Sequence, residues 1–93
     1  MKRRSSAAGL TGFIGFDAAW FGACLKQRRL NKSLTLQELA ALTGFSVSSI
    51  SEMENGQKPT FPKAAGVCQA LGVRLSRVML EAEQHADAAR AAK

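Results

Sequence analysis

The chain has 93 residues, the length of one small domain, which leaves no room for a second, catalytic domain. Lysine and arginine exceed aspartate and glutamate by six, with nine basic and four acidic residues up to position 63 and four and three after it. This imbalance favours a polyanionic partner such as nucleic acid, although an anionic membrane surface would suit it equally.

Residues 1–16 are predicted to form a flexible basic arm, because basic, small and glycine residues alternate there without a sustained period. Its charges are Lys2, Arg3 and Arg4, which could reach phosphates or the minor groove. Two alternatives stay open. The arm could bind anionic vesicles. Alternatively, the run up to Cys24 could be a lipoprotein export signal, although the acidic residue and the glycines in this run argue against an export signal. No other stretch is long and apolar enough to span a membrane.

Residues 18–31 are predicted to form a helix that Asp17 caps. Its inward face is marked by apolar residues at helical spacing, namely Phe21 and Leu25, with Trp20 and Cys24 as further candidates. Basic residues cluster at its far end, where they interact favourably with the helix dipole. Among them, Arg28 and Lys32 are candidates for contacts with DNA phosphates.

A second helix is predicted to begin at Leu36. Thr35 and Glu38 have the spacing at which a hydroxyl and a carboxylate each accept from an amide at a helix start. Gly44 is predicted to end this helix in the left-handed conformation. The predicted apolar face consists of Leu36, Leu39, Ala40 and Leu42.

A third helix is predicted after Ser46, which can cap it, and the pair Asn55-Gly56 is predicted to end it. The predicted inward residues are Val47, Ile50 and Met53. The predicted outward residues are Ser48, Ser49, Ser51 and Glu52. Two short helices joined by a three-residue turn are typical of a helix-turn-helix unit, whose second helix can enter the major groove of DNA. The spacing alone is equally compatible with a helical hairpin that presents serines to solvent.

Two further helices are predicted in the last third of the chain. Thr60 can cap the first, in which the early Pro62 needs no amide partner, and Gly72 ends it. Its predicted core residues are Phe61, Ala65, Val67, Cys68 and Leu71. The last helix begins near Leu75, and its predicted inward side is Leu75, Val78, Met79, Ala82, Ala86 and Ala89. Residues 81–93 are alanine-rich and either extend this helix or fray.

An enzyme is not expected, because the chain has no tyrosine and its single histidine, His85, lies in the polar tail. The serines lack the Gly-x-Ser-x-Gly turn that exposes a nucleophile. Cys24 and Cys68 lack the paired spacing of a zinc site, so we expect no metal, no cofactor and reduced thiols, as in the cytoplasm.

Five short motifs in order resemble the Xre family, the Cro and repressor type of helix-turn-helix domain, over roughly residues 20–80. They are Leu39-Ala40, Gly44, Ser49-Ile50-Ser51, Glu54-Asn55-Gly56 and Ala70-Leu71-Gly72-Val73. The resemblance implies an all-α, five-helix, repressor-like DNA-binding domain over residues 17–80, with residues 81–93 as an addition. Arg74 stands where a capping serine is common in the family, and this departure, with the added tail, leaves the mode of dimerisation open.

The resemblance implies that the third helix reads bases in the major groove, as the corresponding helix of the family does. The predicted base contacts are Ser46, Val47, Ser48 and Glu52, with Ser51 as a weaker candidate. Valine can meet a thymine methyl group and glutamate a cytosine amine. The predicted phosphate contacts are Leu36, Gln37, Arg28, Lys32, Asn55, Lys58 and Lys63. The resemblance also implies an ion pair of Arg29 with Glu54, which braces the unit instead of reading bases.

We therefore expect a transcriptional regulator, a repressor that acts as a homodimer on a partly palindromic operator in double-stranded DNA. One alternative is an antitoxin that binds its own operator and also a toxin, with the acidic, alanine-rich tail as the handle for the toxin. Another is an interaction module that binds no DNA, which would show no salt-dependent binding to genomic fragments.

Overall fold

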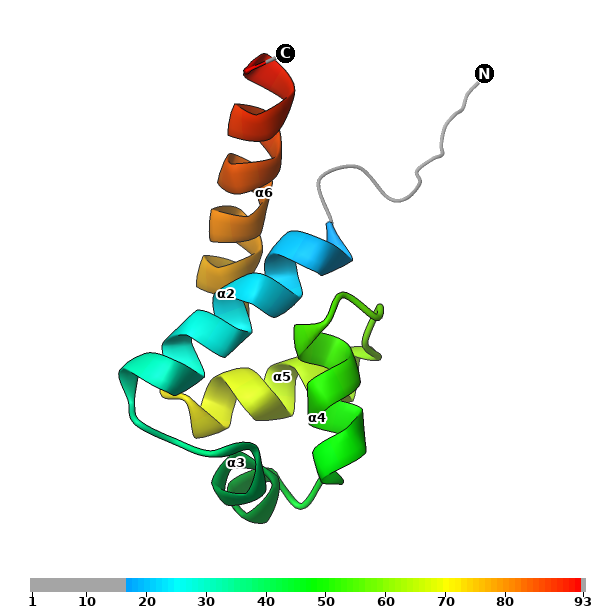
Figure 1. Ribbon diagram of the computed structural model, residues 1–93, viewed down its shortest axis with the longest axis vertical. Helices are drawn as coiled ribbons and strands as arrows, with labels where there is room; N and C mark the ends of the chain where they lie inside the picture. Colours follow the sequence, from blue (N-terminus) through cyan, green and yellow to red (C-terminus); the bar gives the residue numbers. More distant parts are fainter. Residues whose placement is uncertain (1–16, 93) are drawn as a thin grey trace.

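Five helices and no strands make up residues 17–92, the part of the chain that the computed structural model describes (Figure 1). In chain order they are α2 (Ala18–Asn31), α3 (Leu36–Thr43), α4 (Val47–Glu54), α5 (Phe61–Ala70) and α6 (Leu75–Ala91). The all-α fold of five helices that the resemblance implied is therefore confirmed.

The helix starts follow the side chains that the sequence offers as caps. Asp17 accepts a hydrogen bond from the Trp20 amide, at 3.0 Å, and caps α2. The same kind of bond caps the next three helices, from Thr35, Ser46 and Thr60. α6 is the exception: Arg74 occupies its N-cap position and makes no side-chain cap bond.

The core lies where the inward faces of all five helices meet. Its largest fully buried side chains are Phe21, Leu25, Leu39, Ile50, Val67, Cys68 and Val78. Burial also raises the pKa of the Cys68 thiol to about 11, because a charged thiolate is disfavoured away from water. Cys24 and Cys68 are both free cysteines.

Three apolar residues predicted to face inward are instead exposed. The side chain of Leu42 is 61% exposed, because α3 packs through Leu39 and Leu42 lies beyond the edge of that stripe. Phe61 is 73% exposed because it is the first residue of α5, ahead of the segment that packs on the other helices. Ala89 lies on the part of α6 that no other described helix covers. Ala65 is half-buried, and Ala64 is the buried residue in its place.

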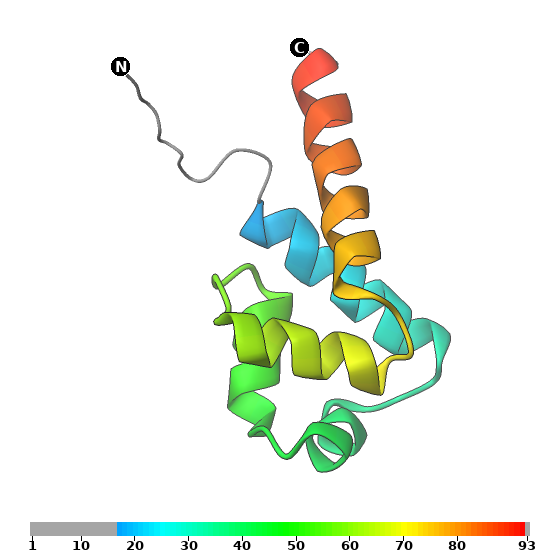
Figure 2. The same cartoon turned by 180° about the vertical axis from the view of Figure 1, so that it is seen from behind.

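α2 lies between α4 and α6 and contacts both of them (Figure 1). α3 packs against α4 and α5, and α5 packs against α6. The C-terminal half of α6 extends past the other helices, away from α3, as both views show (Figure 2). Within residues 17–92, no helix combines the length and the apolar character that a membrane crossing requires.

Candidate nucleic-acid interface

The turn between α3 and α4 is fixed by two local features and by one contact with α5. Gly44 ends α3 with φ +80°, a left-handed conformation that glycine adopts without strain. The Thr43 hydroxyl accepts from the Phe45 amide at 3.2 Å and donates back to the Leu39 carbonyl at 2.9 Å. The Phe45 ring then packs against Gly66 of α5, where a Cβ would lie 3.0 Å from two ring carbons. Together these interactions fix the angle between α3 and α4.

α4 divides sharply into an inward and an outward side. Ile50 and Met53 are buried in the core and hold the helix from within. The outward side is polar, with exposed Ser46, Ser48 and Glu52 and half-buried Ser51. Val47, which was predicted to face inward, is half-buried and is not among the residues packed against the buried core. The Ser46 hydroxyl accepts a hydrogen bond from the Ser49 amide at 3.0 Å, and this cap fixes the residue at which α4 begins. A polar, capped helix side of this kind has the dimensions and chemistry for a major groove.

The end of α4 is tied together by its own side chains. The Asn55 side-chain amide donates to the Ser51 carbonyl at 2.9 Å and to the Ser51 hydroxyl at 3.3 Å. Ser51 therefore has one acceptor position occupied and is half-buried, whereas Glu52 beside it is exposed. Of these two predicted base contacts, Glu52 is the more accessible.

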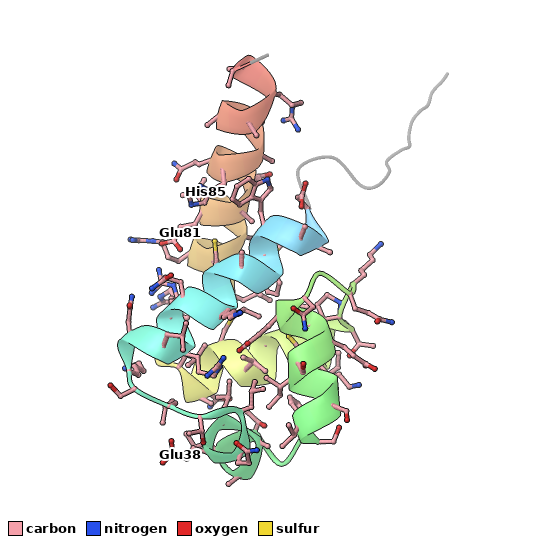
Figure 3. All side chains as sticks on the ribbon, in the orientation of Figure 1. Glu38, Glu81 and His85 are labelled. Atoms are coloured by element: carbon pink, nitrogen blue, oxygen red, sulfur yellow. The ribbon has the colours of Figure 1, made fainter. Side chains whose placement is uncertain are left out.

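The start of α3 leaves two backbone amides outside its capping box. Thr35 and Glu38 form the full capping box: the Glu38 amide donates to the Thr35 hydroxyl at 3.0 Å, and the Thr35 amide donates to Glu38 Oε1 at 2.8 Å. The amides of Leu36 and Gln37 take no part in this box, and the Gln37 side chain is exposed. Figure 3 labels Glu38 on α3, at the opposite end of the molecule from the free part of α6. A helix start with unused amides favours an anion such as phosphate.

Arg29 and Glu54 join α2 to the end of α4 through a two-pronged ion pair. Arg29 Nε lies 2.7 Å from Glu54 Oε2, and Arg29 Nη2 lies 3.0 Å from Glu54 Oε1. A third bond runs from Arg29 Nη1 to the Leu34 carbonyl at 2.8 Å. The side chains are only 8% and 5% exposed, so neither can reach a base. The hydrogen bonds that Arg29 donates to Glu54 raise the pKa of Arg29, and the pair braces α4, the role that the resemblance implied.

Gly22 sets how closely α2 approaches the end of α4. A Cβ at this position would lie 2.2 Å from the Met53 carbonyl oxygen and 2.8 Å from that of Glu54. Only glycine therefore permits this crossing. A glycine in the interior of a predicted helix is the sequence signal for such an approach, although the prediction of this helix did not use it.

The loop after α4 brings lysines to the same side of the molecule as Glu52. Glu52, Gln57, Lys58 and Lys63 line a shallow hollow of about 100 Å³, together with Ser49, Met53, Pro59 and Thr60. Both lysines are exposed, and Lys63 lies in the first turn of α5. Gln57 was not among the predicted site residues, because only the folded loop brings it next to Glu52. Ser49 was not among them either, although it lies one helical turn before Glu52 on α4.

Arg28 does not join the other predicted phosphate contacts. Its guanidinium forms an ion pair with Glu81 of α6, on the other side of α2 from α4. The rings of Trp20 and His85 stack with their centroids 4.9 Å apart, and His85 lies one turn beyond Glu81 on α6. Figure 3 shows Glu81 and His85 together on α6 beside α2. These pairings join α6 to α2. Lys32, the C-cap of α2, is exposed, and the predicted contacts Lys2, Arg3 and Arg4 lie outside the described residues.

The chain belongs to the helix-turn-helix family of DNA-binding transcriptional regulators. The family model for this helix-turn-helix domain matches residues 25–78, more than half of the chain, and it covers the turn, α4 and the start of α6. The resemblance to the Xre type of domain is thereby confirmed. Members of this family bind double-stranded DNA and are not enzymes.

Solved structures of two bacterial regulators share this fold. Two crystal structures of the clp gene regulator ClgR from Corynebacterium glutamicum are 36% identical to the chain. One has a TM-score of 0.67 over 73% of this chain and 90% of that one, and the other 0.71 over 81% and 80%. The restriction-modification controller protein C.AhdI from Aeromonas hydrophila is 24% identical and shares the fold, with a TM-score of 0.63 over 66% of this chain and 94% of that one. No curated protein sequence matches the chain.

Proposed function

We propose that the protein is a sequence-specific transcriptional regulator that reads DNA bases through the outer side of α4. The observation that carries the proposal is the division of α4 into buried Ile50 and Met53 and an exposed side with Ser46, Ser48 and Glu52. Small hydroxyl side chains allow a close approach to base edges, and Glu52 can accept from a cytosine amine. Val47 is the residue that would meet a thymine methyl group.

The start of α3 and the loop after α4 would hold the phosphate backbone on either side of the groove. The amides of Leu36 and Gln37 supply hydrogen-bond donors at a positive helix end. Lys32, Lys58, Lys63 and the amide end of Asn55 supply further contacts. Such contacts position the protein without reading sequence, and their charge makes affinity fall steeply with salt. Arg28 is not included, because its guanidinium is already paired with Glu81.

The regulator would act as a homodimer on a partly palindromic operator, in which each copy reads one half-site. We propose that it acts chiefly as a repressor, by occupying its operator. The cytoplasm is the corresponding location. No neighbour named above is described as an antitoxin, so we do not propose that alternative.

The test begins with genomic DNA fragments retained by the purified protein at two salt concentrations, sequenced to give the operator. Affinities are then measured for every single-base variant of that operator with the wild type and with Glu52→Ala. We expect Glu52→Ala to remove discrimination worth roughly 1 to 3 kcal/mol at one base-pair position. Relative affinities that stay the same across all single-base variants would refute the role of Glu52.

A matched pair of charge variants tests the backbone contacts. Lys63→Ala should weaken binding to all sequences alike and lower the slope of log affinity against log salt by about one. Arg90→Ala is the control, because Arg90 lies near the free end of α6, far from α3 and α4 (Figure 1). An equal change in slope for both variants would contradict a specific phosphate contact at Lys63.

A further inference from the structure

A large hollow lies between α2 and α6, on the side of α2 that faces away from α4. It measures about 430 Å³, which is within the size range of small-molecule sites in proteins. A second hollow, of about 210 Å³, lies at the start of α6. Arg28 lines both hollows, so they adjoin at its side chain. The two hollows together are called the α2–α6 groove below, and its charged and aromatic residues are Trp20, Arg28, Arg74, Arg77, Glu81 and His85.

One end of the α2–α6 groove is aromatic. Trp20 and His85 both line it, and their rings stack with an angle of 13° between the ring planes. Trp20 is half-buried, whereas His85 is exposed. A third flat ring can therefore extend this stack from the side of His85, in the offset arrangement that aromatic pairs prefer.

The other end of the groove is positively charged. Arg74 and Arg77 are exposed, and neither forms an ion pair with any of residues 17–92. They line the second hollow together with Arg28, and none of the described residues that line it is acidic. A guanidinium group binds phosphate through two parallel N–H donors. This end of the groove therefore suits phosphate groups.

Glu81 lies between the two ends. Its Oε2 accepts from Arg28, which balances its charge, while its Oε1 accepts no hydrogen bond from residues 17–92. A carboxylate oxygen that is free to accept suits a sugar hydroxyl, the group that a carboxylate binds in many dinucleotide sites.

These chemical groups follow one another along a single side of α6. Arg74, Arg77, Glu81 and His85 are separated by three, four and four residues, the spacing of neighbours on one helix face. Figure 3 shows Glu81 and His85 on the side of α6 next to α2. At 1.5 Å per residue, Arg77 and His85 lie about 12 Å apart along the helix axis. The groove thus presents rings, a carboxylate and guanidinium groups in that order, over a length comparable to that of a nucleotide.

We propose that the α2–α6 groove binds a ribonucleoside diphosphate. The base stacks on His85, a ribose hydroxyl donates to Glu81, and the two phosphates bind Arg77 and Arg74. A simple anion would use the arginines alone and leave the stacked rings and Glu81 without a role. The groove lies on the opposite side of α2 from α4, so this inference does not depend on the proposed reading of DNA.

Trp20 supplies the measurement, because it is the only tryptophan in the chain. The full chain is titrated without DNA with ADP, GDP, CDP and UDP, and Trp20 fluorescence and calorimetry report binding. We expect saturable binding of at least one of them, with the matching nucleoside and pyrophosphate each at least about tenfold weaker, because each lacks one end of the ligand. Absence of saturable binding by all four at millimolar concentration would overturn the proposal. So would pyrophosphate that binds as tightly as the nucleotide.

A matched pair of double variants separates this site from general attraction to a basic protein. Arg74→Gln with Arg77→Gln removes two positive charges from the groove, and Lys58→Gln with Lys63→Gln removes two from the proposed DNA surface. All four side chains are exposed, so both proteins should fold, which circular dichroism checks. We expect the arginine variant to raise the nucleotide Kd at least about tenfold and the lysine variant to leave it unchanged. Equal losses in the two variants would overturn the proposal.

Two single variants test the order of groups along the groove. His85→Ala should raise the nucleotide Kd roughly fivefold or more, the scale of one stacked base. The wild type should bind the ribonucleotide more tightly than its 2′-deoxy form, and Glu81→Ala should abolish this preference, because the hydroxyl then has no acceptor. An unchanged Kd for His85→Ala, or an unchanged ribose preference for Glu81→Ala, would contradict the proposed arrangement.

Discussion

Two neighbouring arginines on α2 form ion pairs in opposite directions and in different surroundings. Arg29 pairs with Glu54 of α4, with side chains 8% and 5% exposed and a third bond to the Leu34 carbonyl. Arg28 pairs with Glu81 of α6, with both side chains 31% exposed and its Nε buried without a partner among the described residues. The ion pair on the α4 side of α2 is thus buried and fully hydrogen-bonded. The ion pair on the α6 side is partly exposed and leaves one buried donor without a partner. The comparison teaches that the ion pair between α2 and α4 is better shielded from water and more completely bonded than the one between α2 and α6.

Arg29→Ala should have the largest effect, because it leaves Glu54 as a buried charge without its partner. We expect a loss of about 3 to 5 kcal/mol in the free energy of unfolding, measured by urea denaturation. The double variant Arg29→Met, Glu54→Leu is the control, since it removes both charges and should recover much of the loss. A loss below about 1 kcal/mol for Arg29→Ala would show that the α4 side is no firmer than the α6 side.

Gly22→Ala should have the next largest effect. Its Cβ would lie 2.2 Å from the Met53 carbonyl, so α2 and α4 must move apart. We expect a loss of roughly 1 to 3 kcal/mol in unfolding free energy, together with weaker operator binding, although alanine in an ordinary helix interior is more favourable than glycine. A gain in stability, as at an uncrowded glycine, would contradict the close contact between α2 and α4.

Cys68 gives a prediction about the pH dependence of stability. Cys68 is buried in the core, and burial raises its pKa from an ordinary value of 9.0 to about 11. The unfolded thiol therefore ionises before the folded one, so this contribution is complete below pH 9 and is lost as pH rises from 9 to 11. At pH 10 it should cost about 1.4 kcal/mol relative to pH 7.

Cys68→Ala is the variant that isolates this contribution, because it removes the thiol and leaves the other titrating groups in place. The unfolding free energy of Cys68→Ala should fall less steeply between pH 9 and pH 11 than that of the wild type. Equal slopes would show that Cys68 is less protected from water than its position in the core implies.

Arg28→Ala should have the smallest effect. A half-exposed pair has little net strength, and the orphaned Arg28 Nε reduces it further. We expect a loss of roughly 0.2 to 1 kcal/mol in unfolding free energy that shrinks at high salt, with operator binding unchanged. A loss equal to that of Arg29→Ala would remove the distinction between the two sides of α2. A drop in the salt slope of DNA binding would instead return Arg28 to the phosphate contacts.

The local elements were predictable because their signals are local. The capping residue of each of the first four described helices was predicted, and so was the left-handed turn at Gly44, since a side chain three residues from an amide acts on that amide alone. The prediction of buried residues was weaker. Leu42 and Phe61 have helical spacing but are exposed, because periodicity says which residues share a face and not where the neighbouring helix ends.

The sequence by itself determined the class of protein: capped helices of set length, a glycine turn and the motif order of the helix-turn-helix family. Tertiary structure alone decided that Arg28 is bonded to Glu81 of α6, that Gly22 lies against the α4 backbone, and that Gln57 lies beside Glu52. The physical reason is the distance along the chain over which each kind of interaction acts. Caps and turns depend on atoms a few residues apart, whereas ion pairs and close crossings depend on where whole helices come to rest.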